Sequence, residues 1–170
     1  MTLQFDAPLP PDLAGSAEAA VRLEDQGYDG LWIGELRHNP FIQAYEVGKV
    51  TPTAMIGTGI AVALARSPMT VAVSAHDLAA VSGGRFVLGL GSQVKAHVER
   101  RFSMPWSAPA ERMREFIGAV RAIWTWIEMA SLISDEILEE FVIISPPELV
   151  ADRIRQRWLG LADRVTVNYC

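Results

Sequence analysis

The stretch Ser82-Gly83-Gly84-Arg85-Phe86-Val87-Leu88-Gly89-Leu90-Gly91-Ser92-Gln93 decides the fold class, because it joins a helix end, a strand and a glycine-lined loop. The glycine pair predicts the end of a helix, and the apolar residues that follow predict a buried strand. Glycines at the end of a strand let a ligand approach the backbone. Active sites of parallel α/β proteins lie at the carboxyl ends of strands, so we expect this segment to line the functional site.

Composition and charge place the chain among ordinary globular proteins. Half of its 170 residues are hydrophobic and 21% are charged, which is enough to form a sizeable core. The net charge of −5 gives no electrostatic reason to bind nucleic acid or an anionic membrane. The single cysteine, Cys170, excludes a disulfide framework and a cysteine-based metal site. With no secretion signal and no apolar run of about 18 residues, we expect a cytoplasmic protein.

Strand and helix patterns alternate along the first 124 residues. The expected strands are residues 2–6, 28–34, 54–62 and 86–91. A helix ending at Gly27 separates the first two strands, and a second helix begins at the cap Ser67 and ends at Gly83. An amphipathic helix through Met113 and Ile123 follows the fourth strand. This β-α-β-α order predicts a parallel sheet with right-handed crossovers.

The alternation breaks near Trp124-Thr125-Trp126, where the amphipathic helix passes into a second helical stretch, residues 126–140, without a glycine, proline or cap. Residues 145–148 form a capping box that opens a third helix, and residues 164–169 alternate as a final strand. The total is five strands, whereas a closed eight-stranded barrel takes about 250 residues. Most of the tryptophans are most simply core residues: Trp32, Trp124, Trp126 and Trp158.

As a set, these segments resemble the luciferase-like monooxygenase superfamily, and within it the coenzyme F420-dependent oxidoreductases of actinobacterial type. The resemblance covers nearly the whole chain and rests on residues 27–32, 38–41, 56–62, 66–68, 82–97, 99–102, 104–106 and 135–138, and on the closing helix and strand. It implies a (β/α)8 TIM barrel in which the deazaflavin lies across the carboxyl ends of the strands.

Matched to that family, the chain looks like one incomplete barrel domain, residues 1–170. Residues 1–124 correspond to the first four β/α units, and residues 126–170 correspond to the C-terminal helices and the last strand. Strands five to seven are missing, so we expect a junction or a deletion near residues 124–128. Either the protein is an internally deleted relative, or the sequence joins two parts of a longer one.

The resemblance implies catalytic roles for His38 and Glu35. His38 follows the second strand, where relatives place a histidine beside the reactive ring, and it would exchange a proton with substrate or deazaflavin. The alternative is a loop histidine bonded to backbone. Glu35 would bind the cofactor or orient His38, and the alternative is a helix cap or a solvated carboxylate.

The resemblance also implies cofactor contacts on the third and fourth strands. Gly59-Ile60 matches the position of a bulge with a non-prolyl cis peptide that supports the bent ring, although glycines there can also serve tight strand packing. The opening stretch supplies four further candidates for contacts with the ribityl chain or the ring edge, unless it is an ordinary βα turn: Gly89, Gly91, Ser92 and Gln93.

A basic stretch follows the fourth strand and includes Lys95, His97, Arg100 and Arg101. The resemblance assigns it to the phosphate or the polyglutamate tail of F420, and the alternative is a solvated helix face. No metal site is expected.

The implied function is hydride transfer between F420 and a small organic substrate. FMN with oxygen, as in luciferase-type monooxygenases, is the rival chemistry. A third hypothesis is a catalytically silent barrel remnant that acts as a subunit or binding module. An incomplete sheet has open edges and apolar faces that need covering, so we expect a homodimer.

Overall fold

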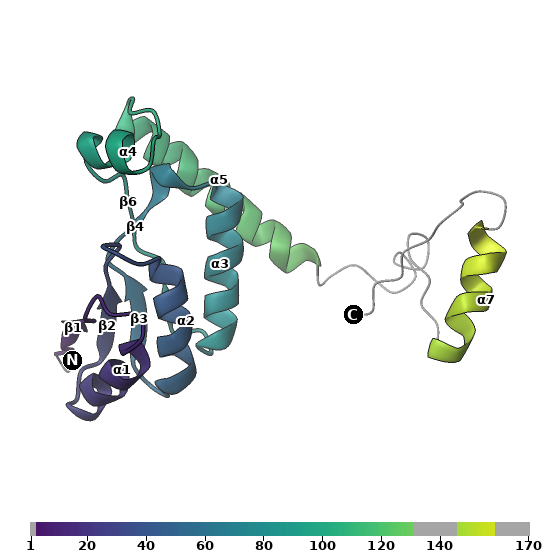
Figure 1. The fold of residues 1–170 in the computed structure, drawn as a ribbon, viewed down its shortest axis with the longest axis horizontal. Coiled ribbons are helices and arrows are strands. Elements are labelled where there is room, and N and C mark those ends of the chain that lie inside the picture. Colours follow the sequence, from purple (N-terminus) through teal and green to yellow (C-terminus); the bar gives the residue numbers. More distant parts are fainter. Residues whose placement is uncertain (1–2, 131–145, 159–170) are drawn as a thin grey trace. The chain divides into compact units, whose positions relative to one another are not determined.

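The computed structural model describes residues 3–130 and 146–158 (Figure 1). The chain separates into two compact units, Met1–Ile127 and Glu128–Cys170. The first unit contains every described strand and carries the candidate site. Of the second unit, the structure describes helix α7, Pro147–Trp158, which begins where the capping box predicts. The final strand expected at residues 164–169 lies outside the described residues.

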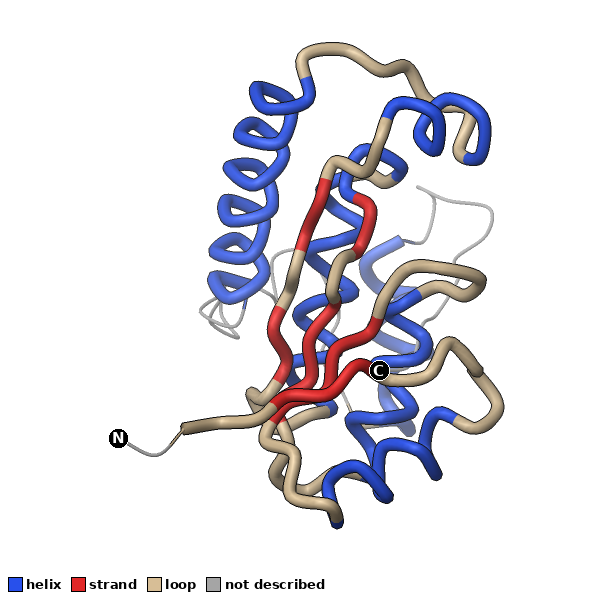
Figure 2. Tube along the Cα trace, turned by 90° about the vertical axis from the view of Figure 1, so that its left-hand side faces the viewer, coloured by secondary structure: helices blue, strands red, loops and turns tan. Residues whose placement is uncertain are grey.

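The first unit is built on a parallel sheet with strand order β1-β2-β3-β5. The bounds of these strands are Asp6–Pro8 for β1, Gly30–Ile33 for β2, Met55–Thr58 for β3 and Phe86–Val87 for β5. A second parallel pair, β4 (Ala61–Val62) and β6 (Leu90–Gly91), continues β3 and β5 after short breaks, as Figure 2 shows. The expected parallel α/β class is confirmed, in the form of a partial barrel.

The strands differ from the expected ones in two ways. The first strand lies at Asp6–Pro8 rather than at residues 2–6, so Pro8 is inside it. Since β1 is an edge strand of the described sheet, the missing N–H of a proline is tolerated there. The strands expected at 54–62 and 86–91 are each divided: the backbone bends at Gly59, and neither Gly59-Ile60 nor Leu88-Gly89 is part of a strand.

Helices connect the strands of the first unit. Their bounds are α1 Ser16–Asp25, α2 Pro40–Val50, α3 Pro68–Val81, α4 Lys95–Arg101 and α5 Pro109–Ala130, with a short 3-10 helix, η1, at Ala63–Ala65. The predicted cap of α3 is confirmed, since the Ser67 side chain accepts a hydrogen bond from the Thr70 amide. Helix α2 starts in the same way, at Asn39-Pro40, a signal that the sequence interpretation did not use.

The core lies between the sheet and helices α1, α2 and α3. Alternate residues of β2 and β3, among them Leu31, Ile33 and Ile56, point toward these helices and are almost fully buried. Phe116 and Val120 of α5 join the same core. These contacts fix the strands, and through them the loops at their carboxyl ends.

The opposite face of the sheet carries Trp32, which is half-buried rather than part of the core. Its Nε1 donates to the Asp6 carboxylate at 2.7 Å, and its ring lies where a Cβ at Gly57 would be, so Gly57 cannot carry a side chain. Trp126, also expected in the core, is 61% exposed.

No helix in the described ranges is long and apolar enough to cross a membrane.

Candidate active site

Hydrogen bonds between neighbouring strands hold the Gly59-Ile60 turn at the carboxyl end of β3. On one side, the Gly59 amide donates to the Ile33 carbonyl of β2 at 2.7 Å. On the other side, the Ala61 amide donates to the Gly89 carbonyl at 2.8 Å. The turn is therefore fixed from both adjacent strands.

The peptide bond between Gly59 and Ile60 is cis. The backbone geometry that the resemblance implied at this point is thus confirmed, while a contact with a cofactor ring remains a prediction. Gly59 is exposed and Ile60 is half-buried. A Cβ at Gly59 would meet the Trp32 ring at 3.5 Å, an ordinary contact, so packing alone does not demand a glycine here.

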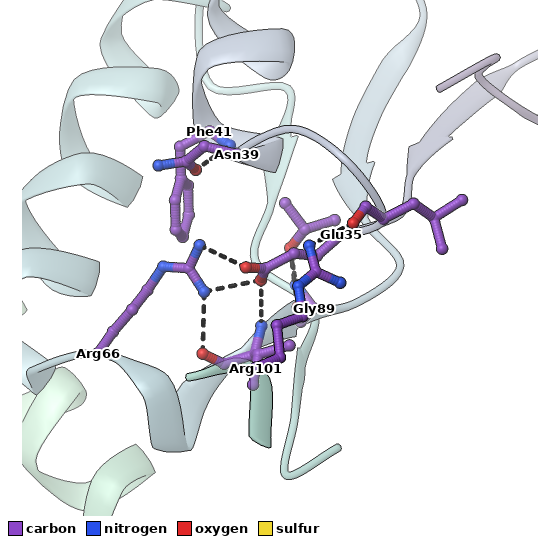
Figure 3. A network of polar contacts seen from close by, with 9 residues as sticks. Glu35, Asn39, Phe41, Arg66, Gly89 and Arg101 are labelled. Atoms are coloured by element: carbon purple, nitrogen blue, oxygen red, sulfur yellow. Dashed lines mark hydrogen bonds and ion pairs between the residues drawn. The ribbon is translucent and has the colours of Figure 1, made fainter. Parts of the chain in front are cut away.

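Glu35 lies just after β2, is only 9% exposed, and has both carboxylate oxygens engaged. Oε2 accepts from Arg66 Nη1 at 2.7 Å and Oε1 accepts from Arg66 Nη2 at 2.9 Å (Figure 3). Oε2 also accepts from the Val62 amide at 2.7 Å. Among the described residues it makes no hydrogen bond with His38. The expected orienting contact is therefore replaced by an ion pair, because Arg66 offers a charged two-pronged donor.

His38 is exposed in the loop between β2 and α2, and it forms no hydrogen bond within the described part of the chain. The next residue, Asn39, caps α2 by accepting from the Phe41 amide at 3.1 Å. On the other side of His38, Arg101 of α4 donates to the Leu36 carbonyl. The loop is therefore held at two points while the imidazole stays accessible, so the alternative of a histidine bonded to backbone does not apply.

Gly89 packs closely against the end of β3. A Cβ there would overlap the carbonyl oxygen of Thr58. A Cβ at Gly91 would lie 2.8 Å from Cδ1 of Ile60. The absence of a side chain at Gly89 is thus explained by the Thr58 carbonyl, and a contact of Gly89 with a cofactor remains a prediction. The absence of a side chain at Gly91 leaves room for the side chain of Ile60, the second residue of the turn.

Ser92 and Gln93 form the turn into α4. Gln93 adopts a left-handed conformation with φ 61°, and its Oε1 accepts from the Val94 amide at 3.0 Å. The Ser92 hydroxyl donates to the Gln93 carbonyl at 3.2 Å. Both residues are half-buried, and their contact with a cofactor remains a prediction.

Helix α4 presents its basic side chains to solvent. Lys95 pairs with Glu99 at 3.8 Å, and His97 and Arg100 are exposed, whereas Val98 is the one buried residue of this helix. A solvated face fits these observations, and anion binding by Lys95 and His97 stays a prediction. Within residues 3–130 and 146–158, no three potential metal ligands come together.

Comparison with known proteins identifies the family. Residues 3–128 match the family model of the luciferase-like monooxygenases. The chain belongs to this family. That match covers every described strand and includes the turn at Gly59-Ile60, the Glu35 ion pair and His38.

Similar luciferase-like proteins are longer than this chain. A Mycobacterium tuberculosis protein named only as uncharacterized is 51% identical over 122 residues, which are 72% of this chain and 36% of that protein. The F420-dependent glucose-6-phosphate dehydrogenase of Amycolatopsis mediterranei is 30% identical over 122 residues, 64% of this chain and 37% of that enzyme. The chain thus spans little more than a third of these relatives.

A solved luciferase-like structure supports the fold. The oxygenating constituent of 3,6-diketocamphane monooxygenase from Pseudomonas putida, in complex with FMN, superimposes with a TM-score of 0.65 at 16% identity. The match covers 73% of this chain and 40% of that chain. At this identity the likeness concerns the fold alone.

Arg66 is the site residue whose role the sequence interpretation missed in this luciferase-like chain. It appeared only as part of a matched segment before the Ser67 cap. Two signals in the sequence could have indicated this role. Glu35 is a polar residue just after a buried strand, and Arg66 lies four residues after Val62. A buried carboxylate requires a partner, and an arginine shortly after the next strand, here just beyond η1, is a suitable one.

Proposed function

We propose that this chain supplies the first half of an F420-binding oxidoreductase site, for hydride transfer between the deazaflavin and a small organic substrate. The observation that carries the proposal is the Gly59-Ile60 turn at the carboxyl end of β3, bonded to the end of β2, whose following loop carries His38, exposed and without a hydrogen bond among the described residues. Binding sites of parallel barrels lie at this end of the strands. The family and the F420-dependent relative support the same chemistry.

The described residues fit a planar cofactor. Gly59 has no side chain and is exposed, so a flat ring can approach the turn, and the half-buried Ile60 offers it an apolar surface. When bound, the deazaflavin supplies the hydride chemistry, and the protein supplies position and electrostatics. Ser92 and Gln93 would hold its ribityl chain, and the exposed cations of α4 would face its anionic tail.

His38 would move the proton that accompanies hydride transfer. Its imidazole is exposed on a loop whose backbone Asn39 and Arg101 hold in place, and it makes no hydrogen bond with the described residues that would occupy its nitrogens. An imidazole exchanges protons near neutral pH, which suits a general acid or base. Glu35 is unsuited to this role because Arg66 and the Val62 amide occupy its carboxylate.

A catalytically silent module is the second candidate function. The described sheet has four strands with open edges at β1 and β5, whereas a closed barrel has eight. Such edges favour association with another chain, and we propose a homodimer. This candidate differs from the first in cofactor turnover, not in fold.

Titration of the intact 170-residue chain with F420 and, separately, with FMN tests the proposal. Saturable F420 binding, followed by the fluorescence of the cofactor, is the expected result. Binding of FMN without F420 would overturn the choice of cofactor in favour of the monooxygenase chemistry. Binding of neither would favour the silent module. An intact mass above 18.6 kDa would show that the natural protein carries further segments.

A further inference from the structure

We propose that Glu35 and Arg66 are a positioning pair that holds the Gly59-Ile60 turn in the place where a planar cofactor meets it. The contacts of the pair are properties of the folded chain alone. Only the last step, the effect on cofactor affinity, rests on the proposed function.

Glu35 and Arg66 form hydrogen bonds with both the amide and the carbonyl of Val62, which lies two residues after Ile60. The Glu35 carboxylate accepts from the Val62 amide at 2.7 Å, and Arg66 Nη1 donates to the Val62 carbonyl at 2.9 Å. The two side chains are joined to each other by two further hydrogen bonds, and they are 5% and 14% exposed. Val62 is thus enclosed in a closed ring of charge-assisted hydrogen bonds, which are stronger than neutral ones.

Main-chain hydrogen bonds hold the Gly59-Ile60 turn itself, and the Glu35–Arg66 pair adds two hydrogen bonds just after it, at Val62. The Gly59 amide bonds to the Ile33 carbonyl and the Ala61 amide bonds to the Gly89 carbonyl. Each of these is a single neutral hydrogen bond to an adjacent strand end. Because β4 has only two residues, Ala61 and Val62, the hydrogen bonds of the Val62 backbone with Glu35 and Arg66 are a large share of its contacts, and they tie β4 to the end of β2.

The same pair also connects the turn to the loop that carries His38. Glu35 lies three residues before His38 in the sequence, and Phe41 lies three residues after His38. The Arg66 guanidinium lies 5.4 Å from the ring centre of Phe41 (Figure 3). One ion pair therefore contacts both expected parts of the site, in addition to the bonds that each part makes by itself. The planar fork of an arginine is needed for this, because a lysine ammonium cannot serve Glu35 and the Val62 carbonyl with the same geometry.

The test compares Arg66→Lys with Arg85→Lys in the full chain. Arg85 is a matched control, since it is also partly buried and donates to the carbonyls of Ala54 and Thr51, each at 2.5 Å, at the amino ends of the strands. Hydrogen exchange of the peptide that contains Val62 is measured without cofactor. Cofactor affinity is measured at a temperature where the circular dichroism of all variants equals that of wild type.

Arg66→Lys is expected to speed exchange at Val62 and to weaken cofactor binding about tenfold, as misplacement of a binding group does. Arg85→Lys is expected to lower thermal stability, but to leave the rate of hydrogen exchange at Val62 and the cofactor affinity unchanged. The double variant Glu35→Gln/Arg66→Met removes the buried charges together, so it is expected to recover stability while its cofactor affinity stays low.

Three outcomes decide the inference. Unchanged exchange at Val62 in Arg66→Lys overturns the pair as a positioning device, and so does an equal loss of affinity in Arg85→Lys. If wild type binds neither F420 nor FMN, the proposed function fails, while the exchange measurement still decides the role of the pair. If Glu35→Gln alone removes one limb of the pH profile of turnover, Glu35 is a proton carrier and the inference is wrong.

Discussion

Thr58 and Gly89 exchange two hydrogen bonds across the carboxyl ends of β3 and β5. The Thr58 hydroxyl donates to the Gly89 carbonyl at 2.8 Å and accepts from the Gly89 amide at 2.9 Å. A threonine hydroxyl can donate and accept at once, so it replaces the strand ladder where the backbone turns. This contact joins the two strands whose ends the candidate site uses.

Gly89→Ala is expected to destabilise the chain by about 3 kcal/mol, because the new Cβ overlaps the Thr58 carbonyl and a backbone group cannot move aside cheaply. Urea denaturation measures the change. Gly118→Ala is the matched control: Gly118 lies inside α5 with nothing within 4 Å of its added Cβ. That variant is expected to gain about 1 kcal/mol, and equal losses in both variants would contradict the role of Gly89.

Gly91→Ala is expected to cost about 2 kcal/mol, less than Gly89→Ala, because its Cβ would lie 2.8 Å from Cδ1 and 2.9 Å from Cγ1 of Ile60, a side chain that can rotate where a backbone carbonyl cannot. The Ile60 side chain then shifts at the edge of the turn. Cofactor affinity should fall more than stability does, which fluorescence titration and urea denaturation together would reveal. Unchanged affinity would argue that Ile60 does not touch the ring.

Gln93→Gly separates backbone strain from side-chain function. The left-handed φ of 61° costs a residue with a side chain about 1 kcal/mol, so the glycine variant should be more stable. If the Gln93 side chain holds the cofactor, the same variant binds it less tightly. Ser103→Gly is the control, because Ser103 has φ 53° and was not assigned to the site. Equal cofactor affinity in both variants would remove Gln93 from the site.

The free energy of unfolding should decrease at acidic pH as the Glu24 carboxylate becomes protonated. Burial raises the pKa of this carboxyl, but hydrogen bonds from the Thr53 hydroxyl and from the Ala54 and Thr53 amides, together with the charge of Arg85, outweigh it and lower the pKa below 4.5. The ionised form therefore stabilises the fold above the unfolded value of 4.5, and this contribution is lost as the pH falls through the lower folded value. Glu24→Gln should flatten the dependence of the urea midpoint on pH between neutrality and about pH 3.

His38→Asn is expected to lower turnover about a hundredfold while cofactor affinity stays near that of wild type. The exposed imidazole makes no hydrogen bond within the described residues, so its loss should leave thermal stability unchanged. Stopped-flow measurement of hydride transfer separates the two effects. A variant with normal turnover would show that the proton comes from elsewhere.

Local signals in the sequence predicted much of the fold. The Ser67-Pro68 cap, the positive-φ Gly27 and the apolar run of β2 each act through the conformation of a few adjacent residues. The split of the strands at Gly59 and at Gly89 was not visible in the pattern of apolar residues, since it depends on which backbone groups of the next strand stand opposite.

By itself, the sequence determined the parallel α/β class and, through resemblance, the family and the turn at Gly59-Ile60, and it predicted a site at the strand ends. Tertiary structure decided the roles of Glu35, Arg66 and Gly89. Each of those roles depends on a contact about 30 positions away along the chain, between Glu35 and Arg66 and between Thr58 and Gly89. Residue type tells that a buried carboxylate needs a partner, but only the packing of adjacent strands tells which residue provides it.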